Sequence, residues 1–93
     1  MDLTGEFITP NAAKYLQQLC KHFAHKIEVS FDGTAGRIPF GFGTAEVSAN
    51  AEALRVRFAD LAADKRDGAK MVIDKHLERF AFREGFAKMR WVD

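Results

Sequence analysis

The chain has 93 residues, of which 47% are hydrophobic and 29% charged, and its formal net charge is +1 at pH 7. This composition is typical of a globular protein and excludes a disordered chain, and the length predicts one domain spanning residues 1–93. The near-neutral charge argues against a strongly electrostatic partner such as bulk DNA, and the single cysteine, Cys20, excludes an intramolecular disulfide.

The first elements predicted along the chain are a short strand and an amphipathic helix. Residues 3–8, LTGEFI, alternate weakly between apolar and polar side chains and indicate the strand. Thr9 is a favourable N-cap and Pro10 fits the first helical position, so we expect a helix from Pro10 to about Ala24. Its apolar residues recur at steps of three and four and form one stripe: Ala12, Leu16, Leu19, Cys20 and Phe23.

The pattern then changes from a helical period to the period of two that is typical of strands. An Asp32-Gly33 pair supplies a turn signal between the first two of these strands. Pro39 suggests an edge position or a bulge, because proline cannot donate a hydrogen bond to a neighbouring strand. The four segments expected to form strands are residues 27–31, 35–40, 41–50 and 53–59.

A second helix and a closing strand complete the prediction. Asp60 or Asp64 is the expected cap of the helix, which we expect to end near Ala81 so that Phe82 turns inward. The apolar stripe of this helix comprises Ala69, Val72, Ile73, Leu77 and Phe80. The closing segment, FAKMRWV, is expected to present three alternate residues to the core: Ala87, Met89 and Trp91.

The predicted order is therefore strand, helix, four strands, helix, strand. Short connections between consecutive strands make them antiparallel neighbours. Two helices with one apolar face each and a sheet with one apolar face bury these surfaces most simply as two layers. We therefore predict an α+β fold, a two-layer sandwich with a mainly antiparallel sheet and both helices packed on one of its faces.

The leading functional hypothesis is a site between the two helices. If the helices pack side by side, Tyr15 and His22 of the first meet His76 of the second, with Arg79 and Arg83 flanking His76. A buried imidazole needs a hydrogen-bond partner, so His76 is either a structural residue bonded to backbone or first-helix groups, or a residue that lines a ligand site. The positions predict a small-molecule or metal-binding module that uses this cleft.

A metal is the one cofactor that the residues suggest, and its identity is unknown. His22 and His25 are three residues apart on the first helix, which brings both within reach of one ion. Two ligands do not complete a metal site, and histidines near a helix C-terminus also favour the helix dipole. An enzyme, with His76 as acid or base and Arg79 or Arg83 holding an anionic substrate, is the weakest hypothesis.

The outer face of the sheet is the second candidate surface. Strand alternation places five basic residues on it, together with the aromatic Phe86: Arg37, Arg55, Arg57, Lys88 and Arg90. Basic residues and aromatics on a sheet can bind nucleic acid, but Glu28 and Glu46 are expected on the same side and neutralise part of the charge. We expect a solvated face or a subunit contact, so the alternative function is a structural or protein-interaction module, with homodimerisation through a sheet edge or face.

The chain is expected to be cytoplasmic. Its first residues, MDLTGEFITPN, contain neither the basic segment nor the apolar run of a secretory signal. No stretch approaches the roughly 18 consecutive apolar residues that cross a bilayer. We therefore expect no membrane association.

The motifs TPNAAKYLQQLCKHFAHKIEVSFD, GRIPF and HLERFAFRE resemble a bacterial family catalogued as domain of unknown function 2218, over nearly the whole chain. The resemblance implies small, stand-alone cytoplasmic proteins without an established activity. The matching motifs contain all three histidines and both flanking arginines named above, without assigning them roles. Similar sequences also carry an aldolase label, for 2,4-dihydroxyhept-2-ene-1,7-dioic acid. The enzymes that own that name resemble (β/α)₈ barrels of about 250 residues, so we do not expect that activity here.

Overall fold

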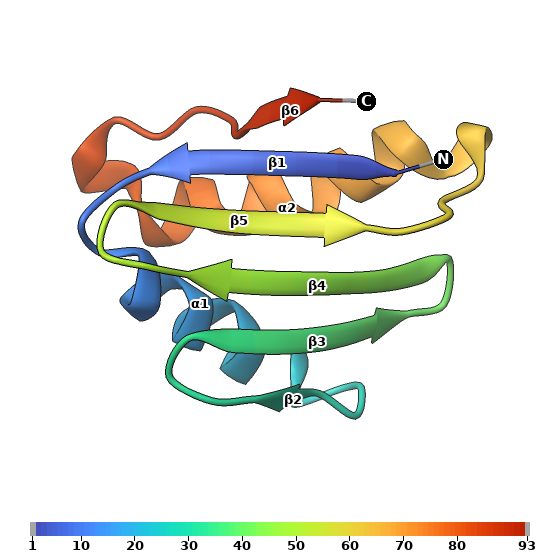
Figure 1. Cartoon of the computed structure of the whole chain (residues 1–93), viewed down its shortest axis with the longest axis horizontal. Helices are drawn as coiled ribbons and strands as arrows, with labels where there is room; N and C mark the ends of the chain where they lie inside the picture. The colour runs from blue at the N-terminus through green and yellow to red at the C-terminus, as the bar shows by residue number, and fades with distance from the viewer. Residues whose placement is uncertain (1, 93) are drawn as a thin grey trace.

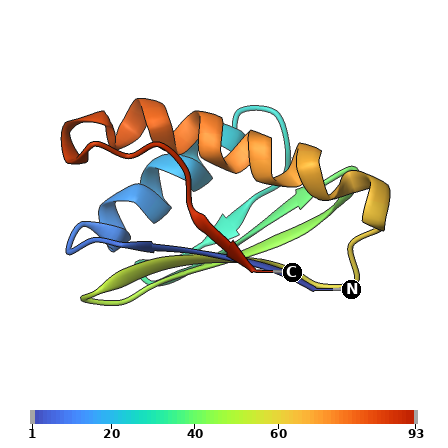
Figure 2. The same cartoon turned by 90° about the horizontal axis from the view of Figure 1, so that it is seen from above.

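The computed structural model describes residues 2–92 and has two layers, a six-stranded antiparallel sheet and two helices that cover one of its faces (Figures 1 and 2). The strands are β1 (Leu3–Ile8), β2 (Ser30–Phe31), β3 (Ala35–Phe40), β4 (Gly43–Ala49), β5 (Ala53–Phe58) and β6 (Arg90–Val92). The helices are α1 (Ala12–Phe23) and α2 (Arg66–Phe80), with single 3₁₀ turns η1 (Ala63–Lys65) and η2 (Phe82–Glu84) on either side of α2. The predicted fold class and element order are confirmed.

The strands are arranged in the order β2-β3-β4-β5-β1-β6. Strands β2 to β5 form a meander, and β1 pairs along the open side of β5, from Leu3 opposite Phe58 to Ile8 opposite Ala53. Strand β6 then pairs with β1, so both ends of the chain lie at one side of the sheet (Figure 1). This insertion of the first strand between the last two is a long-range arrangement that local sequence patterns do not encode.

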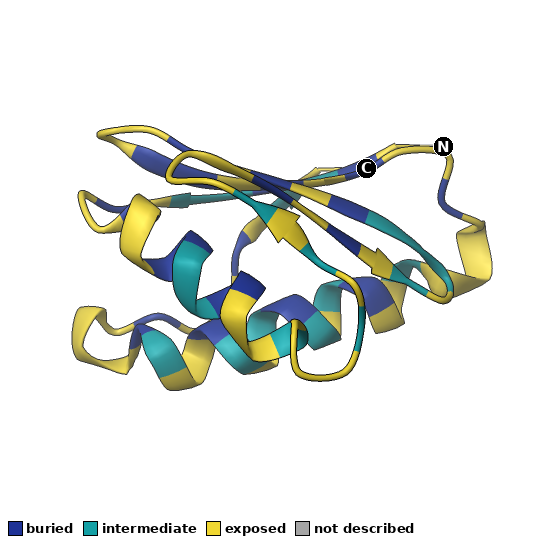
Figure 3. Ribbon diagram, turned by 90° about the horizontal axis from the view of Figure 1, so that it is seen from below, coloured by how far each residue is buried: buried dark blue, intermediate teal, exposed yellow. Residues whose placement is uncertain are grey.

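The core lies between the sheet and the helices, where buried positions of both layers face each other (Figure 3). The predicted stripes of both helices point into it, and Cys20 is fully buried as expected for a core residue. Burying one large aliphatic or aromatic side chain contributes about 1.5–3 kcal/mol, so these residues supply most of the folding energy. The largest of them are Leu16, Leu19, Ile73 and Leu77 from the helices and Leu3, Ile38, Leu54 and Phe58 from the sheet.

The predicted start of the first helix is wrong by two residues. Helix α1 begins at Ala12, and its N-cap position is Asn11, which makes no side-chain capping bond. The Thr9 hydroxyl instead accepts a hydrogen bond from the Asn11 backbone N–H at 3.1 Å, and Pro10 lies in the resulting turn. The Thr9 side chain therefore stabilises the turn before the helix and does not cap the helix itself.

The predicted caps of the second helix are also wrong. Helix α2 follows the 3₁₀ turn η1, its N-cap position is Lys65, and no side-chain capping bond occurs there. Asp64 lies within η1, and Asp60 has a left-handed backbone with φ of 54°. Asp60 thus forms the bend that leads out of β5, a conformation that aspartate tolerates better than most residues.

The segment after α2 differs most from the prediction. Phe82 was expected to turn inward, but it is 64% exposed, with the Arg83 guanidinium 5.7 Å from the centre of its ring. Phe86 was expected on the outer face of the sheet, but it is 8% exposed and packs edge-on against Phe7 at 4.8 Å. Gly85, with φ of 70°, reverses the chain between them and directs Phe86 into the core.

Two of the predicted strands are shorter than expected. The closing strand covers only Arg90–Val92, so Lys88 precedes it, and Ala87 is exposed, although Met89 and Trp91 do turn inward. Strand β2 comprises only Ser30–Phe31 and pairs with β3 at Gly36 and Arg37. Pro39 lies beyond this pairing, so its missing N–H is on an unpaired edge, in agreement with the predicted edge position.

Across residues 2–92, no helix has the length and apolar character to span a membrane.

Candidate functional site

The structure brings together two of the three residues predicted to meet between the helices. The rings of His22 and His76 lie 4.5 Å apart between their centres, one from each helix. Tyr15 is 3% exposed and packs against Phe7 of β1, away from this pair. The expected cluster is therefore a histidine pair without the tyrosine.

His76 is half-buried, at the edge of the apolar stripe of α2, whereas the sequence predicted a buried imidazole. Its Nδ1 lies 2.6 Å from the backbone carbonyl oxygen of Val72, one turn earlier in the helix. A carbonyl oxygen only accepts hydrogen bonds, so Nδ1 carries the proton and donates it. In the neutral ring this leaves Nε2 with a free lone pair.

His22 is exposed, yet its pKa is lowered from the ordinary value. The first cause is partial desolvation, and the neighbouring His76, His25, Lys26 and Arg79 lower the pKa further. A positive charge on any of these four neighbours disfavours protonation of His22. His22 is therefore mainly neutral at pH 7.

The space between the helices is occupied by aromatic rings. Phe23 lies 4.8 Å from the His76 ring and 4.9 Å from Phe40 of β3, and Phe80 lies 6.2 Å from His22. These side chains fill the region where the sequence predicted a cleft. Of the pair, His22 is exposed and His76 is half-buried.

The flanking residues do not complete a metal site or an anion site with this pair. His25 is exposed in the turn after α1, and no group of three or more His, Cys, Asp or Glu residues within residues 2–92 is placed to hold one ion. Arg79 is exposed, and Arg83 lies over Phe82. Burial raises the pKa of the Cys20 thiol to about 11, which makes it a poor nucleophile at neutral pH.

Tyr15 belongs to a second polar cluster, which the sequence did not indicate. The Glu84 carboxylate accepts hydrogen bonds from the Thr9 hydroxyl at 2.7 Å, from the Asn11 amide at 3.0 Å and from the Tyr15 hydroxyl. These donors lower the pKa of Glu84. Desolvation and the adjacent carboxylate raise the pKa of Tyr15 to about 12. The cluster fastens η2 to the turn between β1 and α1.

We expect the titration of Tyr15 to report this contact. Tyr15 is the only tyrosine in the chain, so the ultraviolet absorbance of phenolate isolates it, and half-ionisation is expected near pH 12. Because folding favours its neutral form, the stability that Tyr15 contributes is complete below about pH 10 and is lost as the pH rises through 12. Glu84→Gln removes the charge and should shift the titration toward pH 10.

Glu78→Gln, at an exposed position of α2, is the matched control and should leave the Tyr15 titration unchanged. Glu84 itself should stabilise the fold above its ordinary pKa of 4.5 and lose that effect as the pH falls through the lowered folded value. A normal Tyr15 titration in the unmodified protein would contradict the described contact.

The outer face of the sheet carries two rows of side chains that cross neighbouring strands in register. The first row is Ser30, Arg37, Glu46, Arg57, Thr4 and Val92. The second row is Ala35, Ser48, Arg55, Glu6 and Arg90. Charge alternates along both rows, and the members contributed by β3 and β4 in the second row, Ala35 and Ser48, are small.

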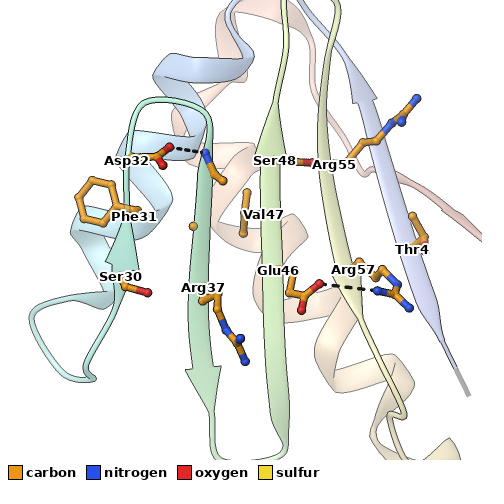
Figure 4. A pocket seen from close by; sticks show the side chains of 12 residues that line it. Thr4, Ser30, Phe31, Asp32, Arg37, Glu46, Val47, Ser48, Arg55 and Arg57 are labelled. Atoms are coloured by element: carbon orange, nitrogen blue, oxygen red, sulfur yellow. Dashed lines mark hydrogen bonds and ion pairs between the residues drawn. The ribbon is translucent and has the colours of Figure 1, made fainter.

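These small residues leave a hollow of about 720 Å³ over β2, β3 and β4 (Figure 4). Ala35 and Ser48 lie across from each other among the residues that line it, and the ring of Phe31 points away from it on the outer side of β2 (Figure 4). Arg37 and Arg55 border it, and a smaller hollow of about 290 Å³ continues past Arg55 toward β6. The outer face is thus a surface with a concave, largely apolar region and charged borders.

The positive charge of this face is smaller than the sequence predicted, because carboxylates pair with two of its arginines. Arg55 binds Glu6 through Nε at 3.0 Å and Nη2 at 2.9 Å. Arg57 binds Asp2 at 2.7 Å and lies 3.7 Å from Glu46. Within residues 2–92 no ion pair forms with Arg37.

Two of the charged residues predicted for this face lie elsewhere. Lys88 precedes β6 and lines neither hollow, and Glu28 lies in the loop before β2. Arg37, Arg55, Arg57 and Arg90 are on the face as predicted. Alternation identified the residues within strands, but it was misleading where the strand was shorter than expected.

Comparison with known proteins agrees with the resemblance seen in the motifs. An NMR structure of PA4090 from Pseudomonas aeruginosa matches with a TM-score of 0.74 and 31% sequence identity, over 98% of this chain and 94% of that protein. No curated protein matches the sequence. The profile described as "Uncharacterized protein conserved in bacteria (DUF2218)" matches residues 4–92. The chain therefore belongs to this DUF2218 family.

Proposed function

We propose that the protein binds a small organic anion with an apolar body in the hollow on the outer face of its sheet. The observation that carries this proposal is the hollow itself, whose volume of about 720 Å³ falls within the range of about 300–1,000 Å³ that is typical of ligand sites. Such sites combine a mainly apolar lining with a few polar groups that orient the ligand. The hollow has this combination.

The charged groups that line the hollow favour an anionic group on the ligand, because the two carboxylates among them already have partners. Asp32 accepts hydrogen bonds from the backbone N–H groups of Thr34 and Ala35. Glu46 lies 3.7 Å from Arg57.

Arg37 has no carboxylate partner within residues 2–92, and its five N–H donors form a fork that matches a carboxylate or phosphate group. The hydroxyls of Ser30 and Ser48 lie nearby as further donors. Ala35, Gly36 and the aliphatic stem of Arg37 suit the apolar body of the same molecule.

The same charges argue against nucleic acid. A nucleic-acid surface gains its affinity from cations that replace the counterions of many phosphates. Arg55 and Arg57 are already neutralised by Glu6, Asp2 and Glu46. Among the arginines of this face, Arg37 and Arg90 form no ion pair within residues 2–92. Two cations on strands far apart in the sheet support recognition of a single anionic group better than recognition of a polyanion.

The test is an NMR titration of the protein with phenylacetate and, separately, with the neutral analogue phenylethanol. We expect phenylacetate to shift the backbone amides of β2, β3 and β4 around the hollow, and phenylethanol to bind more weakly. Arg37→Met keeps the side-chain stem but removes the charge, so it should weaken phenylacetate binding about three- to tenfold. Ser48→Trp should fill the hollow and abolish binding of both molecules.

Lys88→Met is the matched control, because it removes one exposed cation that does not line the hollow. It should leave the affinity unchanged. Equal losses in Lys88→Met and Arg37→Met would show that the attraction is only general electrostatics. Shifts confined to the helices would place the ligand elsewhere, and either result would overturn the proposal.

A second copy of the chain is the competing occupant of this face. Ile8 and Val92 are large apolar residues that are mostly exposed, and both lie at outward positions of β1 and β6. A homodimer through the face would shift outer-face amides with increasing protein concentration and without ligand. In that case, Ser48→Trp would alter the association and not a ligand affinity.

We also infer a reducing, cytoplasmic setting. The support for it is the single cysteine, Cys20, which has no disulfide partner in the chain and lies buried in the core. Fractionation of cells that express the protein would test this inference.

A further inference from the structure

The histidine pair between the helices has no part in the site proposed above. His22 and His76 come from different helices, and both helices cover the face of the sheet opposite the hollow (Figure 2). His22 is exposed and His76 is half-buried. Two imidazoles this close would repel each other if both were protonated.

We propose that His22 and His76 together bind one late first-row divalent metal ion, with Cu²⁺ bound more strongly than Ni²⁺ or Zn²⁺. Imidazole nitrogen is a preferred ligand of these ions, and the affinity of such sites increases toward copper. The remaining coordination positions are open to water or to a small anionic ligand. The site is distinct from the outer face of the sheet and does not depend on the function proposed for that face.

The distance between the rings fits one shared ion. At metal–nitrogen distances of about 2.0–2.1 Å, two imidazoles in adjacent coordination positions have ring centres roughly 4.5–5 Å apart. The observed separation is 4.5 Å. The two rings are tilted by 54° to each other, and His76 is held in place by its hydrogen bond to the Val72 carbonyl oxygen.

The hydrogen bond of His76 is the kind that prepares a metal ligand. Metal-binding histidines almost always donate their other ring N–H to a carboxylate, a backbone carbonyl or water, which orients the ring and fixes the tautomer. His76 makes this bond through Nδ1 to the Val72 carbonyl oxygen, so Nε2 is the ligand atom. Its support comes from the backbone of a rigid helix, and Phe23 packs against the ring.

The charges around the pair favour a metal that brings an anionic ligand with it. Lys26, Arg79 and His25 are the further basic groups that act on His22. They weaken binding of a bare dication but attract a chelate with net negative charge. A nickel ion held by nitrilotriacetate has this charge and leaves two adjacent coordination positions free for imidazoles.

The first experiment is retention of tag-free protein on a nickel–nitrilotriacetate matrix. We expect retention that free imidazole reverses. His22→Gln, which changes an exposed residue, should release the protein, and so should His76→Gln. His25→Gln is the matched control and should remain bound. Retention of His22→Gln would overturn the proposal. Release of His25→Gln would overturn it too, because it would assign the ion to His22 and His25 instead.

The second experiment is thermal unfolding with and without NiCl₂, CuCl₂ or ZnCl₂, with each variant compared with its own metal-free sample. An ion that binds only the folded state raises the melting temperature, and this ion also links α1 to α2. We expect the metal to raise the melting temperature of the parent and of His25→Gln but not that of His22→Gln. By calorimetry, His22→Gln should bind the metal at least about tenfold more weakly than the parent.

If His76→Gln does not fold, the His22→Gln result and the side-chain nitrogen spectrum of the parent decide the matter. Diamagnetic Zn²⁺ should shift the Nε2 resonance of His76 and leave its Nδ1 proton in place. A Zn²⁺ titration that leaves the His76 nitrogens unchanged would overturn the proposal. So would a melting temperature that does not respond to any of the three ions.

Discussion

Asp74→Ala is expected to destabilise the fold by about 2–4 kcal/mol, because the carboxylate accepts two hydrogen bonds that hold the last strand in place. Oδ1 accepts from the Met89 backbone N–H at 2.8 Å, and Oδ2 accepts from the Trp91 indole N–H at 2.9 Å. Hydrogen bonds to charged groups contribute about 1.5–3 kcal/mol each, and alanine leaves both partly buried donors without an acceptor. The measurement is urea unfolding followed by the fluorescence of Trp91, the only tryptophan.

For a chain of this length the loss is a large part of a total stability of about 5–10 kcal/mol and lowers the melting temperature by roughly 10–20 °C. Glu78→Ala, an exposed carboxylate on the same helix, is the control and should change stability by less than about 0.5 kcal/mol. Asp74→Asn keeps one hydrogen-bond acceptor, so its stability should lie between those of Asp74→Ala and Glu78→Ala. Equal stabilities of Asp74→Ala and Glu78→Ala would contradict the anchoring role.

Gly5→Ala is expected to destabilise the fold by about 1–3 kcal/mol, which is the usual range for overpacking. A Cβ at this position of β1 would lie 2.7 and 2.8 Å from two ring carbons of Trp91. Replacing glycine by alanine otherwise gains about 0.4–1 kcal/mol by restricting the unfolded chain, but the overlap exceeds that gain. The indole cannot swing aside without breaking its hydrogen bond to Asp74. Urea unfolding measures the effect.

Gly41→Ala is the matched control, since nothing lies within 4 Å of a Cβ there, and it should be neutral or slightly stabilising. The losses of stability caused by Asp74→Ala and Gly5→Ala should not be additive, because both changes act on Trp91. Once Asp74→Ala has released the indole, Gly5→Ala should cost less, and the coupling is measurable in a double-mutant cycle. Full additivity would show that Trp91 does not link β1 to α2.

The contacts between β6 and α2 also illustrate the limit of sequence reasoning. Alternation in FAKMRWV correctly directs Met89 and Trp91 inward. It misplaces Phe86, because that residue precedes the strand and follows the left-handed turn at Gly85. A period of two applies only where the chain is extended, and the sequence does not mark where β6 begins.

The two candidate sites differ in how far they were predictable. Helical spacing predicts that His22 and His76 meet if the helices pack together, and the structure places their rings 4.5 Å apart. The Tyr15–Glu84 contact joins residues 69 positions apart and has no local signal. Nor does any spacing rule reveal that Ala35, Ser48 and Arg55 lie in line across three strands.

The amino-acid sequence alone determined the two-layer α+β class, the element order and the residues of both helical stripes, because burial imposes a period of 3.6 or 2 on each element. It also identified which arginines the strands direct outward. The tertiary structure decided the insertion of β1 between β5 and β6, the pairing of those arginines with acids, and the hollow among the small side chains. These depend on the register between strands distant in sequence, which is set by the packing of the whole sheet and by no single segment.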